Sequence, residues 1–123
     1  LATIYYAMQE YKKAYSQADR ILEADKDNVN AMNIAALSLI ELNKLTEAEE
    51  LLDYALDFDY DSAKTWYSLA VLNAKKGNED RAIFHLKRAV EIDPDYMNTA
   101  QRDPAFDGLK NNRQFDRIIK NTP

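Results

Sequence analysis

Apolar positions recur every three or four residues along most of the chain, a spacing that places them on one face of an α-helix. Two short segments, Asn43-Lys44 and Gly77-Asn78, interrupt the pattern. Gly and Asn tolerate the left-handed backbone conformation that ends a helix, so these segments predict turns. The pattern predicts amphipathic helices over residues 1–8, 11–24, 29–42, 45–58, 63–75, 79–92, 95–101 and 112–120.

The helical pattern itself repeats along the chain. Ala14, Ala48 and Ala82 stand 34 residues apart, without gaps. Each period holds two predicted helices, and a single helical hairpin cannot bury its apolar face alone, so a period of this length predicts stacked hairpins with a continuous core. Other positions that keep the same register are Leu22, Leu56 and Val90, then Asp25, Asp59 and Asp93.

The turns between the two helices of a period are too short for anything but antiparallel packing, with axes about 8–10 Å apart. Such close packing requires small side chains where the helices meet. We expect Ala36 to face Ala48, and Ala70 to face Ala82. The larger Trp66 is expected to fill the edge of the third hairpin.

Composition narrows the class of protein further. The chain has 123 residues, enough for one domain, and its two glycines and three prolines are too few for the many turns of a β-sandwich or barrel. The absence of Cys and the single His argue against a disulfide scaffold, thiolate chemistry and a multi-histidine metal site. The formal net charge of −5 has the wrong sign for a dedicated nucleic-acid or anionic-membrane binder.

Motifs for catalysis or metal binding are weak. His85 lies between Phe84 and Leu86 without a partner at catalytic spacing, so we expect a surface or half-buried structural residue. The stretch 57–61 opens like a calcium loop, but Ser62 and Ser68 stand where such a loop needs Gly and Glu. The sequence therefore predicts no catalytic residue, no cofactor and no metal, and we expect that the chain is not an enzyme.

Charge is distributed unevenly. Residues 41–61 hold eight acidic side chains against one lysine, whereas residues 75–88 hold five basic side chains against two acidic ones. A solvated outer face accounts for both runs. The alternative is a charge-complementary partner or head-to-tail self-association.

The third period resembles the tetratricopeptide repeat family most fully. The residues that carry this resemblance at the family's spacings are Trp66, Leu69, Ala70, Gly77, Ala82, Leu86, Ala89 and Pro94. In the second period Asn43 replaces the Gly and Tyr60 replaces the Pro. The first period lacks half of its first helix and has Ile21 where an Ala is usual. The family implies a right-handed α-solenoid of antiparallel helix pairs that recognises proteins.

The resemblance implies a single all-α domain over residues 1–123 with about two and three-quarter repeats. Its expected parts are a partial first repeat over 1–28, a second repeat over 29–62, a third over 63–96, and a broken fourth helix with a C-terminal cap over 97–123. Asp103-Pro104 interrupts the first helix of the fourth repeat. The segment that follows resembles the C-terminal capping segment of many bacterial members of the family.

The family also implies a peptide-binding groove lined by the first helix of each repeat. Tyr67 is expected to face this groove with its hydroxyl free, because Trp66 takes the position between the helices. The positions expected in the groove are Tyr6, Asn30, Asn33, Leu37, Ile40, Lys64, Tyr67, Val71, Lys75, Gln101 and Arg102. Their amide, phenol and ammonium groups suit hydrogen bonding to an extended backbone.

We therefore expect a non-catalytic module that binds a protein or peptide segment, whose identity the sequence does not reveal. The alternative is a scaffold, accessory or oligomerisation domain of a larger enzyme or envelope protein. The longest apolar stretch, residues 34–40, is too short to span a membrane, so no membrane insertion is expected. The compartment stays open, since we expect any targeting signal to lie upstream of residue 1.

Overall fold

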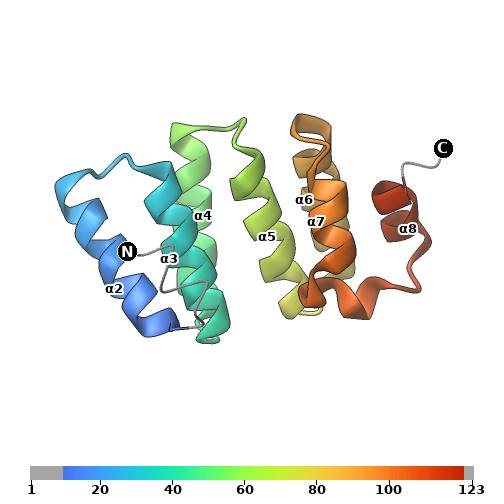
Figure 1. Cartoon of the computed structure of the whole chain (residues 1–123), viewed down its shortest axis with the longest axis horizontal. Helices are drawn as coiled ribbons and strands as arrows, with labels where there is room; N and C mark the ends of the chain where they lie inside the picture. Colours follow the sequence, from blue (N-terminus) through green and yellow to red (C-terminus); the bar gives the residue numbers. More distant parts are fainter. Residues whose placement is uncertain (1–9, 121–123) are drawn as a thin grey trace. The chain divides into compact units, whose positions relative to one another are not determined.

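The computed structural model describes residues 10–120, and every regular element in that range is a helix. This confirms the all-α fold, with helix ends within one residue of those predicted (Figure 1). The predicted helix over 1–8 lies outside the described residues. The elements are α2 (Tyr11–Ala24), α3 (Val29–Glu41), α4 (Leu45–Phe58), α5 (Ala63–Lys75), α6 (Glu79–Ile92), α7 (Tyr96–Arg102), the 3₁₀ helix η1 (Pro104–Leu109) and α8 (Arg113–Lys120).

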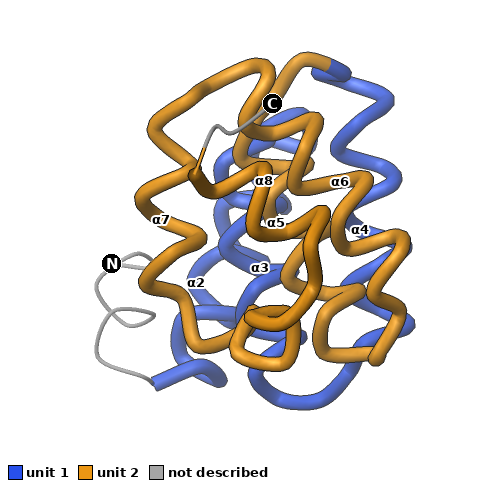
Figure 2. Tube along the Cα trace, turned by 90° about the vertical axis from the view of Figure 1, so that its right-hand side faces the viewer, with its two compact units in different colours: residues 1–60 blue, residues 61–123 orange. Residues whose placement is uncertain are grey.

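The chain divides into two compact units, residues 1–60 and residues 61–123 (Figure 2). In the first unit α3 packs against both α2 and α4. Ala18, Ile34 and Ala35 form a buried cluster there, with Tyr15 and Leu51 packed against it. Because α3 has neighbours on two sides, nine of its 13 residues are buried.

Equivalent turns end the first helix of each hairpin. Asn43 has a φ of 63° and Gly77 a φ of 80°, both in the left-handed region. After each, a backbone N–H bonds back to the helix: Lys44 to the Leu39 carbonyl at 2.8 Å and Asn78 to the Asn73 carbonyl at 2.9 Å. These bonds satisfy carbonyls that the helix ends would leave unpaired, which confirms the predicted turns.

In the second unit α5 and α6 form the most closely packed hairpin. Its small residues are fully buried, as close antiparallel packing requires: Ala70 and Ala82 are both inaccessible to solvent, as are Ala36 and Ala48 in the first unit. Ser62 caps α5 by accepting a hydrogen bond from the backbone N–H of Thr65 at 3.3 Å.

The chain after α7 folds back over the hairpin. Asp103 adopts an extended backbone before Pro104, which ends α7, and the chain continues as η1. Contacts join η1 to α5 and α8 to α6. The buried apolar residues of this segment are Phe106, Leu109 and Phe115.

The last helix keeps the period of the repeats. The second helix of each hairpin begins at Tyr11, Leu45 and Glu79, and α8 begins at Arg113, again 34 residues further on. Asn112 caps α8 by accepting from the backbone N–H of Gln114 at 2.9 Å. The C-terminal segment therefore follows the repeat register, with a first helix that breaks after Arg102.

Candidate protein-binding surface

The predicted groove positions of the first unit are unevenly exposed. Asn30 is exposed and Leu37 half-buried, whereas Asn33 and Ile40 are buried. The Asn33 side chain donates to the Val29 carbonyl at 3.1 Å, within its own helix. Tyr6, also predicted for the groove, lies outside the described residues.

The predicted groove positions of the second unit are also unevenly exposed. Lys64 and Lys75, near the two ends of α5, are exposed, as are Gln101 and Arg102 on α7. Tyr67 and Val71, which lie between the two lysines along α5, are buried. In this unit the basic positions and Gln101 of the predicted groove therefore reach the surface, while Tyr67 and Val71 do not.

Tyr67 is enclosed by the C-terminal segment. Its hydroxyl donates to the Asp103 carboxylate at 2.7 Å, and its ring stacks on Tyr96 with centroids 4.7 Å apart. The Tyr67 and Phe106 rings pack edge to face, with centroids 5.7 Å apart. The expectation of a free hydroxyl is wrong, because the break at Asp103-Pro104 turns the chain over this part of α5.

Asp103 connects α5 to the start of η1 through the two oxygens of its carboxylate. One carboxylate oxygen accepts from Tyr67, and the other accepts from the backbone N–H of Ala105 at 2.9 Å, which caps η1. The same residue thus ends α7, starts η1 and fixes both to α5. A short polar side chain with two acceptors suits all three roles.

A tyrosine in each unit has a raised phenol pKa. Burial raises the pKa of Tyr96, and the nearby Asp93 raises it further. In the first unit burial raises the pKa of Tyr15, with Asp19 and Glu47 adding to the effect. Both phenols are neutral near pH 7, and their rings pack: Tyr96 stacks on Tyr67, and Tyr15 lies against the buried cluster of the first unit.

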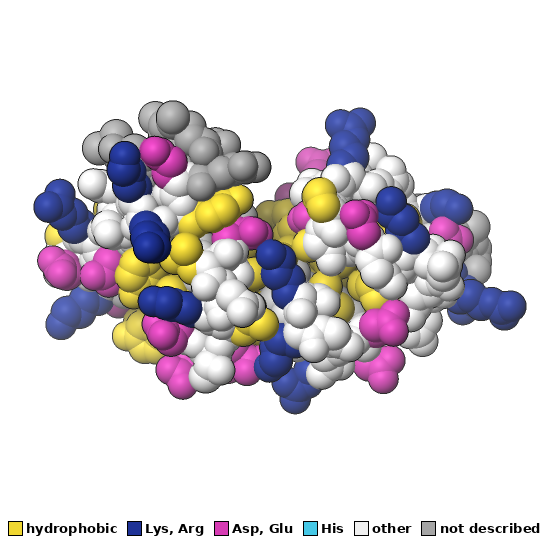
Figure 3. Space-filling view, turned by 90° about the horizontal axis from the view of Figure 1, so that it is seen from below, with side chains coloured by type: hydrophobic (Ala, Val, Ile, Leu, Met, Phe, Trp, Pro, Cys, Tyr) yellow, Lys and Arg dark blue, Asp and Glu magenta, His cyan; other side chains and the backbone are white. Residues whose placement is uncertain are grey.

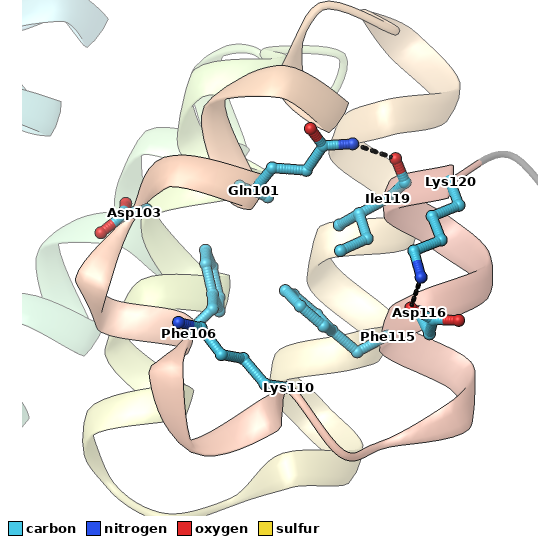
Figure 4. Close-up of a pocket in the computed structure, with 9 residues that line it drawn as sticks. Gln101, Asp103, Phe106, Lys110, Phe115, Asp116, Ile119 and Lys120 are labelled. Carbon is cyan, nitrogen blue, oxygen red and sulfur yellow. Dashed lines mark hydrogen bonds and ion pairs between the residues drawn. The ribbon is translucent and has the colours of Figure 1, made fainter.

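A cavity of about 370 Å³ lies between α7, η1 and α8 (Figure 4). The rings of Phe106 and Phe115, 5.7 Å apart, form part of its wall. At its rim Gln101 donates to the Ile119 carbonyl at 2.6 Å, and Lys120 pairs with Asp116 at 2.9 Å. An apolar wall with a polar rim suits an apolar side chain of a partner.

A second hollow, of about 550 Å³, lies between α6 and α8. Its lining includes the apolar Ile83, Phe84 and Ile118 beside the basic Lys87 and Arg117. Neither hollow was predicted from the sequence, since α8 lines both and its placement is a tertiary property. On one face of the molecule, hydrophobic side chains reach the surface among acidic and basic ones (Figure 3).

The single histidine packs against aromatic rings. His85 is half-buried, with its ring 5.6 Å from Trp66 and 5.5 Å from Phe84, which confirms the structural placement predicted for it. Over residues 10–120, no group of three His, Cys, Asp or Glu side chains is placed to hold a metal ion. Within the same range, no helix has the length and apolar character needed to cross a bilayer.

Comparison with known proteins confirms the family resemblance. Residues 63–96 match the family model of the tetratricopeptide repeat, so the third period is a repeat of this family. Residues 1–55 match the model described as anaphase-promoting complex, cyclosome, subunit 3. The match over residues 63–96 spans the α5–α6 hairpin.

Two curated relatives resemble most of the chain. The N-terminal acetyltransferase A complex auxiliary subunit NAA15 of Arabidopsis thaliana is 31% identical over 92 residues, which is 75% of the chain. The N-terminal acetyltransferase B complex subunit NAA25 homolog of Caenorhabditis elegans is 27% identical over 112 residues, which is 89% of the chain. The chain spans only 10% and 12% of the lengths of these relatives.

Proposed function

We propose that the chain is part of a non-catalytic auxiliary subunit, in which helical repeats hold other proteins of a complex. The observation that carries this proposal is the similarity of most of the chain to two subunits of N-terminal acetyltransferase complexes, one named as auxiliary. Repeats of this family generally mediate protein–protein interaction. In such a complex another subunit would transfer the acetyl group.

The geometry supports a scaffold more than a reaction centre. Tyr67 and Asp103 bind each other at 2.7 Å and hold η1 against α5. The histidine packs against Trp66 and Phe84. Polar side chains inside the helices bond to the backbone one turn earlier, as Ser38 does to the Ile34 carbonyl at 2.8 Å. These groups stabilise the fold.

The test uses the full-length protein that contains this chain. Tagged protein is purified once after expression alone and once from its native cells, and each preparation is assayed for acetyl transfer to the N terminus of short peptides. We expect activity only in the preparation from native cells, where the catalytic partner co-purifies. Captured complexes without this activity would contradict the assignment to an acetyltransferase complex.

The second candidate is the peptide groove, which the exposed lysines of α5 favour. Lys64 and Lys75 lie eleven residues apart, which places them on nearly the same side of the helix and about 16 Å apart along it. An extended acidic peptide of about five residues spans this distance. Arg102, exposed at the end of α7, adds a third positive charge.

The groove is tested with a fluorescent peptide that alternates Glu and Ser. Binding to the chain is expected to weaken about tenfold in Lys64→Ala/Lys75→Ala. Lys12→Ala/Lys13→Ala, at exposed positions of α2, is the charge-matched control and should bind as the wild type does. Equal losses in both double variants would show a non-specific effect of net charge.

A further inference from the structure

The outer face of α4 carries aromatic side chains that the fold leaves exposed. Tyr54 is 47% exposed and Phe58, one turn later, is 43% exposed. Their rings pack edge to face, with centroids 5.0 Å apart. Tyr60, just after the helix, is 61% exposed. Isolated exposed aromatics are common, but neighbouring ones on one helix form a patch of the kind that marks interaction sites.

Carboxylates flank this aromatic patch. Residues three and four apart on a helix lie side by side, so Glu50 and Asp57 are the neighbours of Tyr54 along the surface. Both acidic side chains are exposed, as is Asp53. A ligand that covers the rings would therefore meet negative charge beside them.

The placement of these charges opposes helix stability. Asp57 lies in the last turn of α4, Asp59 caps its end, and no basic residue occupies that turn. The C-terminal end of a helix carries partial negative charge, so carboxylates there repel it and cations are favoured. A positively charged ligand would relieve this repulsion.

The corresponding face of α6 carries more positive charge, although Glu91 stands one period after Asp57. The residues that follow Glu47 and Asp53 by one 34-residue period are Arg81 and Lys87, both exposed. This face also holds an exposed aromatic ring, Phe84, at 62%. The α6 face therefore has an exposed ring beside basic side chains and serves as a comparison surface for α4.

We propose that the α4 patch, defined as Glu50, Asp53, Tyr54, Asp57 and Phe58, docks a Lys- and Arg-rich segment of a partner protein. Cationic side chains stack on exposed aromatic rings and pair with carboxylates beside them, so this chemistry satisfies both features of the patch. The inference does not depend on the acetyltransferase assignment, because it uses only the surface of the first unit.

The probe is a fluorescein-labelled octapeptide that alternates Arg and Leu, titrated with the whole chain and followed by fluorescence anisotropy. An octapeptide that alternates Glu and Leu tests whether apolar contact alone suffices. We expect only the basic peptide to bind, and its affinity to fall when salt is raised, because salt screens exposed charges. Equal binding of the acidic peptide would overturn the proposal.

Two pairs of variants locate the site. Tyr54→Ala/Phe58→Ala is expected to weaken binding of the basic peptide at least tenfold, whereas Phe84→Ala leaves it unchanged. Asp57→Lys is expected to weaken binding while raising the melting temperature, since it removes a repulsive charge from the helix end. Glu91→Lys changes net charge equally at the equivalent position of α6 and should bind as the wild type does.

The outcomes separate a specific site from its alternatives. If Phe84→Ala or Glu91→Lys reduces binding as much as the α4 variants do, the peptide recognises overall charge and the proposal is wrong. If the chain instead self-associates in sedimentation and the α4 variants abolish this, the occupant is a second copy, which also overturns it. Melting curves of each variant show that a loss of binding is not a loss of folding.

Discussion

Tyr67 and Asp103, 36 residues apart in the sequence, are joined by a 2.7 Å hydrogen bond between the phenol and the carboxylate. Tyr67 belongs to the first helix of the α5–α6 hairpin, and Asp103 marks the break in the helix that begins the next period. The bond therefore couples one repeat to the interruption of the following one. A hydrogen bond to a charged acceptor is among the stronger ones in proteins.

Replacing this phenol tests the coupling. We expect Tyr67→Phe to lower the free energy of unfolding by about 1–3 kcal/mol, because Asp103 loses a partner while the ring packing is kept. Denaturant titration followed by circular dichroism measures the effect. Tyr60→Phe, at a residue 61% exposed, is the control and should change stability by less than about 0.5 kcal/mol. Equal stability of Tyr67→Phe and wild type would contradict the coupling.

The turn after α5 offers a test of backbone conformation. Gly77 has a φ of 80°, and an added Cβ would meet no atom within 4 Å. Any effect of Gly77→Ala is thus conformational, and we expect a loss of about 1–2 kcal/mol in unfolding free energy. Gly108→Ala, also in open space but without a positive φ, should leave stability unchanged or raise it by up to about 1 kcal/mol. Thermal melts of the two variants compare them directly.

Trp66 anchors the third hairpin. It is 5% exposed and contacts His85 on α6. Trp66→Ala should leave a cavity and cost about 3–5 kcal/mol of stability, measured by denaturant titration. Phe84→Ala, which removes a ring that is 62% exposed, should cost far less. Similar losses in the two variants would show that Trp66 does not occupy a core position.

Alkaline pH should destabilise the second unit through Tyr96. Burial, with Asp93 adding, raises the pKa of its phenol in the folded chain. This raised pKa contributes stability to the folded chain. The contribution is complete below the unfolded pKa of about 10 and is lost as the pH rises through the pKa of Tyr96 in the folded chain. The free energy of unfolding, measured at about pH 9 and about pH 11, should therefore fall less between the two pH values in Tyr96→Phe than in the wild type. Identical losses would exclude this contribution.

Helix positions were predictable from the sequence because they depend on local pattern. The three- and four-residue spacing fixes the helices, and turn residues such as Asn43 and Gly77 fix their ends. The 3₁₀ helix after Pro104 was missed, since six residues carry no period that separates them from a loop. Local signals therefore gave the elements but not the path of the chain after the break.

The environment of Tyr67 was not predictable in the same way. Its helical phase relative to Trp66 is local information, but the segment that covers it comes from residues about thirty to forty positions later. Which side chains meet there depends on how the chain turns at Asp103, a tertiary property. The exposed α4 patch was not predicted for a related reason, since sequence alone does not separate exposed aromatic residues from buried ones.

The break in the fourth period occupies as many residues as the intact helix it replaces, since α8 still begins 34 residues after α6. Its origin therefore needs only point substitutions and no insertion or deletion. Asp103 and Pro104 stand where the previous period has Leu69 and Ala70. Substitutions at these two positions would therefore remove the helix-breaking pair while every later residue stays in phase with the repeats.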